Sequence, residues 1–397
     1  MAETSLYRDR NLHIIFGVTL LSVIGISAII PAFPSIIREL GITGSQVGLL
    51  LTFFTLPGVI LTPFLGILAD RFGRKRILVP SLILFSLAGT ACAFIRDFNF
   101  LLGMRVLQGI GGASLNSLNN TIIGDLYSAK QRVQAMGLNA SVLTIGAASY
   151  PIIGGALTLL GWYYPFALSI IALPVGILVL TSLKNPEPKN FRGLGEYLRG
   201  IRSCLNDIRI VGLFATNLLA FVFMFGAYLS YFPLLIGEFG ASSFIIGLIL
   251  ASASLTNAAT ASQLSRVNRW FSLTTIIKGT FAIYALALVL IPLMPSLWLL
   301  LLPAIIFGIG GGLNMPAIQT SVADLAPLEY RGAFMSINST MIRLGQTIGP
   351  PLMGLVYVYQ GSDATFFVAA ALALVVPLVA TVFRQRKQPE DIKPSAV

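Results

Sequence analysis

Charged residues are scarce in this sequence, and acidic residues are the scarcer of the two signs. Only 10% of the 397 residues are charged, with 26 Lys and Arg against 15 Asp and Glu, whereas 56% are hydrophobic. A water-soluble protein uses roughly 25% charged residues to cover its surface. The composition therefore excludes an ordinary soluble domain and favours a protein that lies in a lipid bilayer.

Histidine and cysteine are almost missing. His13 is the only histidine, and Cys92 and Cys204 lie far apart in the chain, so no disulfide or metal-ligand spacing is present. A membrane-embedded enzyme would need paired histidines, a Cys–His set or carboxylates within the membrane. We therefore expect no metal, no cofactor and no enzymatic activity.

Long polar stretches are also rare. Charged and Pro/Gly clusters divide the chain into about twelve apolar stretches of roughly 20–27 residues, each long enough to cross a ~30 Å hydrocarbon core as a helix. Strand-like alternation is absent, which disfavours a membrane barrel. We predict an all-α membrane protein with twelve transmembrane helices. The predicted spans are 12–34, 45–68, 76–95, 99–124, 135–159, 163–183, 210–236, 244–264, 273–293, 297–322, 333–357 and 363–383.

The net charge of +11 is unevenly distributed among the segments that flank these spans. The odd-numbered flanking segments carry 21 of the 26 Lys and Arg residues, and the even-numbered ones carry only Arg38 and Arg96. Loops on the cytosolic side of a membrane are enriched in Lys and Arg. The asymmetry predicts a multi-pass protein of the cytoplasmic (plasma) membrane with both termini in the cytosol, and it implies no nucleic-acid partner.

The chain divides into two related halves. Residues 105–155 align with 304–354 without a gap, and 13 of the 51 aligned positions are identical. This duplication predicts two pseudo-symmetric six-helix bundles, 1–183 and 210–397, with a substrate site between them near the middle of the membrane. The longest polar segment, 184–209, joins them and includes a basic amphipathic helix that we expect to lie on the cytosolic membrane surface.

A motif of glycines and charges joins the second and third spans. The segment reads "GILADRFGRK", in which a tight turn needs a glycine and a carboxylate lies beside basic groups and a helix terminus. This order of residues goes well beyond what a merely basic loop requires. Its members are Gly66, Asp70, Arg71, Gly73, Arg74 and Lys75.

Together with two further motifs, this loop resembles the signature of the major facilitator superfamily, within it the twelve-helix drug:proton antiporter branch. The fourth span matches Arg-x-x-Gln-Gly-x-Gly from Arg105 onward. The fifth span is similar to the antiporter signature Gly-x-x-x-Gly-Pro-x-x-Gly-Gly, with Tyr150 in place of the second glycine. The matching residues of the fifth span are Gly146, Pro151, Gly154 and Gly155.

The resemblance implies a monomeric secondary transporter that works by alternating access and exports a small amphipathic substrate. It implies that Asp70, Arg74 and Asp125 form a latch against the eleventh helix in the outward-facing state. Glycines of the fifth helix would pack closely against neighbouring helices, and Tyr150 would either loosen that groove or point into the cavity. A proton is the coupling ion that the branch suggests.

Two arginines lie well inside predicted spans. Burial of an arginine in a membrane costs at least about 2.5–3.5 kcal/mol, so such residues face the protein interior or water. Arg105 begins a polar stripe that continues through Asn116 and Asn119, and it is either a structural anchor or a residue of the cavity. Arg343 lies near mid-membrane with Gln346 on the same face, and we predict that it binds substrate.

Further candidates for the substrate site follow from helical spacing. Asn217, Met224, Tyr228 and Tyr231 recur on one face of the seventh span. Aromatic and methionine side chains suit large apolar ligands of varied shape, although the same face could equally pack against another helix. Asn314 in the tenth span is a weaker candidate.

Every acidic residue lies in a loop or within about one turn of the end of a span. A carboxylate embedded in the membrane, whose pKa burial raises, is what lets a proton compete with a cationic drug. Its absence favours a neutral or anionic amphipathic substrate for this exporter. The alternative is a transporter of an organic anion or lipid-like metabolite that works by exchange or uniport.

Overall fold

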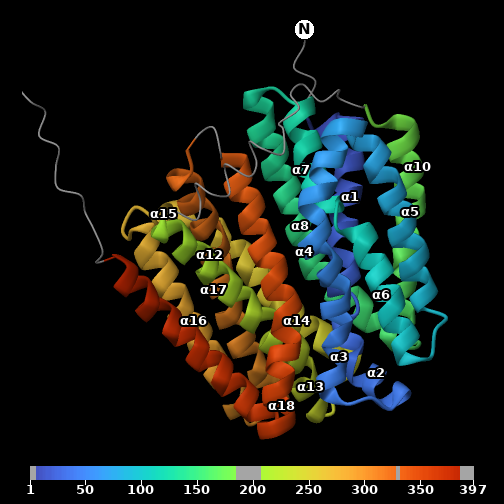
Figure 1. Cartoon of the computed structure of the whole chain (residues 1–397). Coiled ribbons are helices and arrows are strands. Elements are labelled where there is room, and N and C mark those ends of the chain that lie inside the picture. Colours follow the sequence, from blue (N-terminus) through green and yellow to red (C-terminus); the bar gives the residue numbers. More distant parts are fainter. Residues whose placement is uncertain (1–5, 185–206, 328–330, 385–397) are drawn as a thin grey trace, which may run out of the picture.

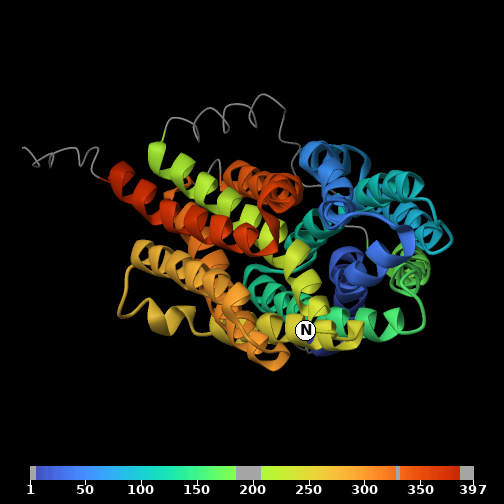
Figure 2. The same cartoon turned by 90° about the horizontal axis from the view of Figure 1, so that it is seen from below.

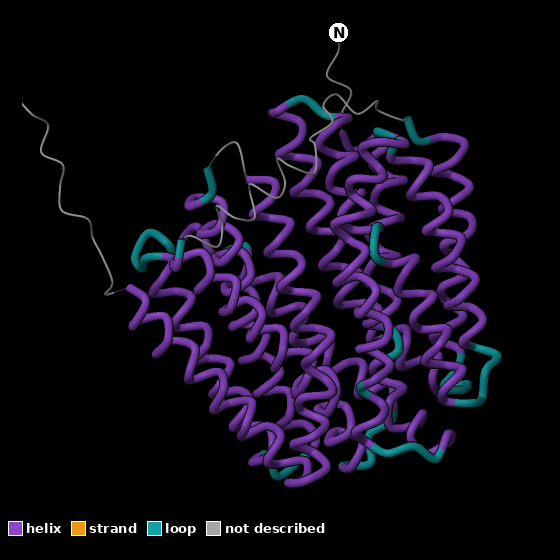
Figure 3. Tube along the Cα trace, in the orientation of Figure 1, coloured by secondary structure: helices purple, strands orange, loops and turns teal. Residues whose placement is uncertain are grey.

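The computed structural model describes residues 6–184, 207–327 and 331–384, and all regular structure in these residues is helical (Figure 3). The prediction of an all-α fold is confirmed for this part of the chain. The amphipathic helix expected within 184–209 falls almost entirely outside the described residues, so its placement stays a prediction.

The first bundle contains the helices that precede residue 185. Asp9 and Asp97 start its helices α1 and α6, because each side chain accepts a hydrogen bond from a backbone N–H of the first turn. The helices are η1 (Leu6–Arg8), α1 (Arg10–Ser27), η2 (Ile30–Ala32), α2 (Phe33–Leu40), α3 (Gly44–Val47), α4 (Leu49–Phe72), α5 (Arg74–Cys92), α6 (Phe98–Gly112), α7 (Leu115–Leu126), α8 (Ala129–Thr158), α9 (Tyr164–Ala167), η3 (Leu168–Ile171) and α10 (Ala172–Ser182).

The second bundle contains the helices that follow residue 206. Asp207, Ser242 and Ser272 cap the starts of three of them in the same way. Its longest element bends sharply at Gly361, whose φ of 84° breaks it into two helices. The elements are α12 (Ile208–Phe223), the π-helix η4 (Met224–Leu229), α13 (Ser230–Glu238), α14 (Ser243–Ala261), α15 (Leu264–Val267), α16 (Leu273–Leu293), η5 (Leu297–Leu300), α17 (Leu301–Leu325) and α18 (Arg331–Arg384).

The helices account for twelve crossings of a membrane. Ten stretches of the described residues are long and apolar enough to span by length and composition alone. One of them, Phe334–Val376, covers both arms of α18 and so represents two crossings. The consecutive helices α6 and α7 supply the remaining crossing. Their polar residues, Arg105 among them, keep the hydropathy of this stretch low.

The two bundles stand side by side (Figures 1 and 2). We call the end of the molecule that carries the N-terminus the terminal face, and the end that carries α2, α3 and α13 the distal face (Figure 1). Helix α8 of the first bundle packs along α14 of the second, and α4 packs along α18. In Figure 1 the bundles lie closest near the distal face and splay apart toward the terminal face.

A polar contact recurs in both bundles at equivalent places. The Thr19 hydroxyl donates to Asn139 Oδ1 at 2.5 Å, which joins α1 to α8. In the second bundle Asn217 Nδ2 donates to Asn338 Oδ1 at 2.8 Å, which joins α12 to α18. Asn139 and Asn338 are equivalent positions of the sequence repeat. The pseudo-symmetry expected from the repeat therefore extends to individual buried hydrogen bonds.

Candidate functional site

The seam between α8 and α14 joins the two bundles through backbone contacts. A Cβ added at Gly155 would lie 2.3 Å from the carbonyl oxygen of Ser243, and one at Gly247 would lie 2.2 Å from that of Pro151. Real side chains do not tolerate such separations, so glycine is required on both helices. The fifth-helix motif of the sequence thus lies at the contact between the bundles.

The remaining residues of that motif pack inside the first bundle. A Cβ at Gly154 would lie 1.9 Å from the carbonyl oxygen of Ala28, so α8 lies directly on the end of α1. Gly146 faces Leu20 and the ring of Tyr150, one turn along the same helix. Tyr150 is half-buried and packs against the first bundle's core, which leaves the close glycine contacts intact.

The second seam, between α4 and α18, is held by threonines. The hydroxyls of Thr55 and Thr347 lie 2.9 Å apart, and the Thr52 hydroxyl donates to the carbonyl oxygen of Thr347 at 3.0 Å. Toward the distal face, a Cβ at Gly48 would lie 3.1 Å from the Pro350 side chain. In this conformation the described contacts between the bundles therefore lie in the middle and distal parts of the molecule.

Arg343 lies at the end of this seam that is nearer to the terminal face. Its Nη2 donates to the carbonyl oxygen of Ala113 at 3.2 Å, across the bundle boundary. A Cβ at Gly58 would lie 2.4 Å from Nη1, so the guanidinium rests against bare backbone of α4. The side chain is half-buried, and the group that accepts its hydrogen bond is a neutral carbonyl. Gln346, three residues on, is also half-buried.

Arg105 lies in a different environment, with no part of it exposed. Its guanidinium donates from Nη2 to the carbonyl oxygen of Gly25 at 2.8 Å and from Nε to that of Leu50 at 3.0 Å. Nη1 donates to Gln108 Oε1 at 2.7 Å. The ring of Phe54 covers one face, with its centroid 4.3 Å from Cζ. All of these groups belong to the first bundle. This geometry favours a structural anchor over a residue of the cavity, the two alternatives that the sequence left open for Arg105.

The rest of the polar stripe on α6 and α7 also turns inward. Asn119 is buried and donates from Nδ2 to the carbonyl oxygen of Ile15 at 3.0 Å and to the Thr19 hydroxyl. It therefore extends the polar contact between α1 and α8 rather than facing the second bundle. The side chain of Asn116 lies outside the described residues, so its predicted role in binding is untested.

The aromatic face of the seventh crossing packs against other helices. Tyr228 is 3% exposed and stacks on Phe307 of α17 with centroids 4.0 Å apart. Tyr231 is fully buried and stacks on Tyr357 at 4.7 Å. Neither hydroxyl has a hydrogen-bond partner among the described residues. In this conformation both rings pack against other helices. Among the four candidates on this face, only Met224, at the start of η4, is half-buried rather than buried.

The two asparagine candidates of the second bundle are likewise enclosed. Asn217 is 1% exposed and pairs with Asn338, although its own Oδ1 has no partner among the described residues. Asn314 is 2% exposed and accepts a hydrogen bond from the Thr280 hydroxyl at 3.0 Å. Neither is open to a ligand in this conformation.

The loop motif forms a charged cluster at the terminal face. Arg74 Nε lies 2.7 Å from Asp125 Oδ2, which joins the start of α5 to the end of α7. Lys75 Nζ donates to the carbonyl oxygen of Leu183 at 3.2 Å, and Gly73 adopts a φ of 97° that favours glycine. Both side-chain contacts stay within the first bundle.

The three remaining members of the motif are Arg71, Asp70 and Gly66. Arg71 is exposed, with its Cζ 5.4 Å from the centroid of the Phe72 ring. The side chain of Asp70 lies outside the described residues, as does the environment of Gly66. The inter-bundle part of the predicted latch therefore stays a prediction.

Beside this cluster, Tyr127 and Asp9 join α7 to the start of α1. The Tyr127 hydroxyl donates to Asp9 Oδ2 at 2.7 Å. Burial, and then the hydrogen bond and charge of Asp9, raise the pKa of Tyr127 well above its ordinary value. The tyrosine therefore stays neutral and fixes one corner of the terminal face.

Reasoning from the sequence missed the residues that complete the seams. Gly58, Thr55 and Gly247 lie outside the recognised motifs, and nothing in their local spacing marks them as contacts between bundles. Small residues inside a span are a weak signal of close helix packing. They could have been found from that signal only once the partner helix was known.

Comparison with known proteins agrees with this architecture. The family model of the Major Facilitator Superfamily matches residues 15–295 and 236–397. The chain is 25% identical over 389 residues to the Quinolone resistance protein NorA of Staphylococcus aureus, covering 96% of this chain and 98% of that protein. It is 26% identical over 378 residues to Multidrug resistance protein 1 of Bacillus subtilis, covering 94% and 96%.

Solved structures share the fold at lower sequence identity. A bacterial homolog of the human lysosomal transporter Spinster, inward-facing and unoccupied, superposes with a TM-score of 0.82 at 18% identity, covering 97% of this chain and all of that one. The nucleoside transporter NupG superposes with a TM-score of 0.81 at 14% identity, covering 95% and 99%. With the family model matching nearly the whole chain, this protein belongs to the major facilitator superfamily of membrane transporters.

Proposed function

We propose that this transporter exports amphipathic organic compounds by alternating access and that it favours neutral or anionic substrates. Relatives named for resistance to quinolones and to multiple drugs support export as the direction. The glycine and threonine seams support a rocking motion, because small residues let two helices separate and close again without repacking large side chains.

The charge preference depends on Arg343. Its guanidinium lies at the boundary between the bundles and donates a hydrogen bond to the neutral carbonyl oxygen of Ala113, which also accepts one from the Thr62 hydroxyl. A carboxylate or phosphate on a substrate would be a stronger acceptor than that carbonyl, because charge-assisted bidentate pairs with arginine are about twice as strong as neutral hydrogen bonds. Arg343 can therefore exchange Ala113 for an anionic substrate.

The described acidic residues are placed where they would not oppose this preference. Asp9, Asp97 and Asp207 cap helix starts, and Asp125 and Glu238 lie at helix ends. A substrate anion near Arg343 would thus meet a positive potential. A cation would meet no carboxylate at the same depth among the described side chains.

Transport of a matched pair of dyes tests the role of Arg343. We expect Arg343→Ala to slow efflux of a carboxylate-bearing xanthene dye about 10- to 100-fold, because a hydrogen bond to a charged group contributes about 1.5–3 kcal/mol. The methyl ester of the same dye should lose far less. Efflux from proteoliposomes by purified protein measures both rates.

Two variants make this experiment decisive. Arg343→Lys keeps the charge and should retain part of the transport of the carboxylate dye. Lys278→Ala removes another cation from a membrane span and should leave the ratio of the efflux rates of the two dyes unchanged. An equal loss for acid and ester in Arg343→Ala would show that the residue does not select substrate charge.

A second candidate function is exchange or uniport of an organic anion without proton coupling. The placement of the described carboxylates at helix ends favours it, because proton-coupled exporters of cations use a carboxylate within the membrane. If it holds, dye flux should change less than about twofold between proteoliposomes with and without a pH gradient of one unit, measured at constant membrane potential. A steep dependence on the gradient would instead support proton antiport.

We further propose a monomer whose two termini lie in the cytosol, so that the terminal face is the cytosolic one. The sequence asymmetry of Lys and Arg supports this orientation. The segments 1–183 and 210–397 would then be the two bundles, and 184–209 would tether them at the cytosolic membrane surface. We propose that the protein moves its substrate without converting it chemically.

A further inference from the structure

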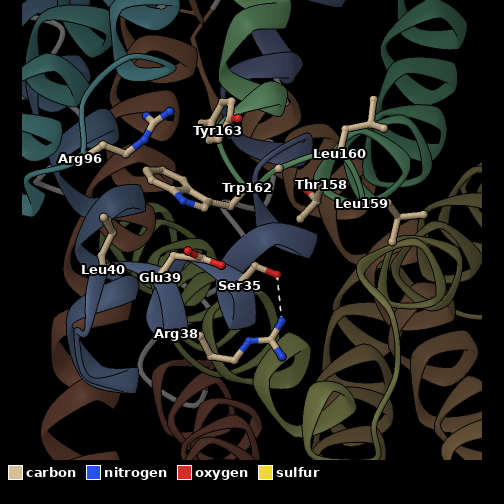
Figure 4. Close-up of a pocket in the computed structure, with 11 residues that line it drawn as sticks. Ser35, Arg38, Glu39, Leu40, Arg96, Thr158, Leu159, Leu160, Trp162 and Tyr163 are labelled. Atoms are coloured by element: carbon tan, nitrogen blue, oxygen red, sulfur yellow. Dashed lines mark hydrogen bonds between the residues drawn. The ribbon is translucent and has the colours of Figure 1, made fainter.

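A polar pocket lies on the distal face and is lined by residues of the first bundle. It has a volume of about 470 Å³, which is within the range of small-ligand sites. Helix α2 forms one wall, and the turn that joins α8 to α9 forms the other (Figure 4). The side chains that bear on its chemistry are Arg38, Glu39, Arg96, Leu159, Leu160 and Trp162.

Arg38 and Arg96 make this pocket unusual. They are the two Lys and Arg residues that the sequence places in even-numbered flanking segments, which otherwise carry none. They are 58 positions apart in the chain, yet the fold brings both to one pocket. Because loops on that side of a membrane normally avoid basic residues, their convergence calls for a specific partner.

The guanidinium of Arg96 is held in place before any ligand binds. It lies 4.0 Å from the ring centroid of Tyr163 and 5.2 Å from that of Trp162. Its Nη1 also donates to the carbonyl oxygens of Ala93 at 2.8 Å and Ile95 at 3.1 Å. The remaining N–H groups are free to bind an anion at a reduced entropic cost.

The pocket carries charged side chains of both signs, with an acidic residue between two basic ones. Glu39 lies between Arg38 and Arg96 in Figure 4, and no carboxylate of the described residues comes within salt-bridge distance of either guanidinium. Arg38 makes one long hydrogen bond, of 3.4 Å, to the Ser35 hydroxyl. The pocket thus offers two cationic groups and one anionic group, all exposed and unpaired among themselves.

The rim of the pocket is apolar and open. Leu159 and Leu160 are 62% and 72% exposed, and in Figure 4 their side chains point away from the arginines. Exposed leucines beside charged residues are expected where a membrane protein meets the boundary between lipid headgroups and acyl chains. A ligand of this pocket would therefore have a charged end and an apolar end.

We propose that this pocket binds the headgroup of a phospholipid that carries both a phosphodiester and an amine, as phosphatidylethanolamine does. Arg38 and Arg96 bind the phosphodiester, which arginine recognises through paired N–H groups. Glu39 binds the ammonium through its carboxylate. The acyl chains lie along Leu159 and Leu160. The proposal places the lipid in the leaflet opposite the terminal face, and it is independent of the substrate proposed for the transporter.

Native mass spectrometry of the delipidated full chain tests the proposal, with phosphatidylethanolamine and phosphatidylglycerol of identical acyl chains as probes. We expect Arg38→Gln to weaken binding of both lipids at least fivefold. Glu39→Gln should weaken binding of phosphatidylethanolamine alone and so remove the preference between them. Arg269→Gln, on an exposed turn at the terminal face, is the matched control and should leave that preference unchanged.

Arg96 is tested with a conservative change because its stacking also supports the turn. Arg96→Lys keeps the charge but loses the paired donors, and we expect it to weaken binding of both lipids while thermal unfolding stays as in the wild type. Equal binding of both lipids by the wild type, or no change in Arg38→Gln, would overturn the proposal. Displacement of the lipid by an equal concentration of glycerophosphoethanolamine would also overturn it, since the site would then serve a soluble ligand.

Discussion

Arg105 and Arg343 are both cations at membrane depth, the first buried and the second half-buried, and their partners give them different roles. Arg105 uses Nε, Nη1 and Nη2 within its own bundle, on two backbone carbonyls and Gln108. Arg343 reaches from the second bundle to a single described carbonyl of the first. A guanidinium that donates from all three of its nitrogens within one bundle stabilises that bundle, whereas one with unused donors at the boundary between bundles can bind a ligand.

The first prediction concerns the contribution of Arg105 to stability. Arg105→Leu removes three hydrogen bonds from a charged donor, and we expect it to destabilise the protein by roughly 3 kcal/mol or more. Thermal unfolding in detergent measures the change as a marked fall in Tm. Arg343→Ala is the control, and its Tm should stay close to the wild-type value. Similar Tm values for both variants would contradict the anchoring role.

The sequence indicates that both arginines are unusual but cannot by itself tell them apart. Helical spacing identified the polar stripe that begins at Arg105. The carbonyl groups of Gly25 and Leu50, however, are presented by α1 and α4, and every residue has a carbonyl. Spacing also failed to separate a cavity face from a packing face at Tyr228, because a stacked ring and a ligand-binding ring occupy the same helical positions.

At the scale of single elements, the glycines of α8 and α14 set how closely the two bundles approach. Gly155 and Gly247 each face a backbone carbonyl of the opposite helix. The sequence motif predicts close packing of the fifth helix. It did not predict that Gly155 would contact the second bundle while Gly154 contacts α1, because the partner of a glycine is decided by the three-dimensional arrangement.

The second prediction is that Gly155→Ala opens the distal seam. A methyl group at this position must push α14 away, and overpacking of this kind costs about 1–3 kcal/mol, or roughly a 5- to 150-fold shift in a conformational equilibrium. Spin-label distances across the distal face should lengthen in the variant. Gly103→Ala, where a Cβ would meet nothing within 4 Å, is the control and should leave the distances unchanged. Unaltered distances in Gly155→Ala would show that the seam tolerates a side chain.

At the scale of the whole molecule, the two bundles are closed against each other at the distal face. At the terminal face, none of the described contacts of the loop motif joins the two bundles. The pair of Arg74 and Asp125 holds α5 to α7, but both residues belong to the first bundle. The second-half segment equivalent to this loop, 261–270, lacks the acid and the glycines. In the predicted latch, the charged loop motif therefore comes from the first bundle alone.

The third prediction is that Asp125→Asn slows turnover. The change removes one charged partner of Arg74, whose side chain is only 9% exposed, so the loop should lose the geometry needed to meet the second bundle. We expect the dye efflux rate to fall severalfold, while affinity for the dye stays within about twofold. Asp324→Asn changes the equivalent residue of the repeat and serves as the control. Wild-type turnover in Asp125→Asn would exclude the pair from the conformational cycle.

The overall fold was the part most easily predicted, because hydropathy, the distribution of basic residues and the internal repeat are all properties of the chain itself. The predicted count of twelve crossings includes the crossing formed by α6 and α7, which are helical although their hydropathy is too low to identify them as a span. What escaped prediction depends on the relative placement of the halves. Contacts such as that of Thr55 with Thr347 join residues from the two halves of the chain and leave no periodic trace in the sequence.

The enclosure of Arg105 within the first bundle has a consequence for biosynthesis. Its acceptors, on α1, α4 and α6, all precede residue 113, so they have left the ribosome before the second half is translated. The most costly charge of the early chain can thus be neutralised while the nascent protein is still being inserted. The first half can settle in the bilayer as a unit, and the second half then assembles against a preformed surface.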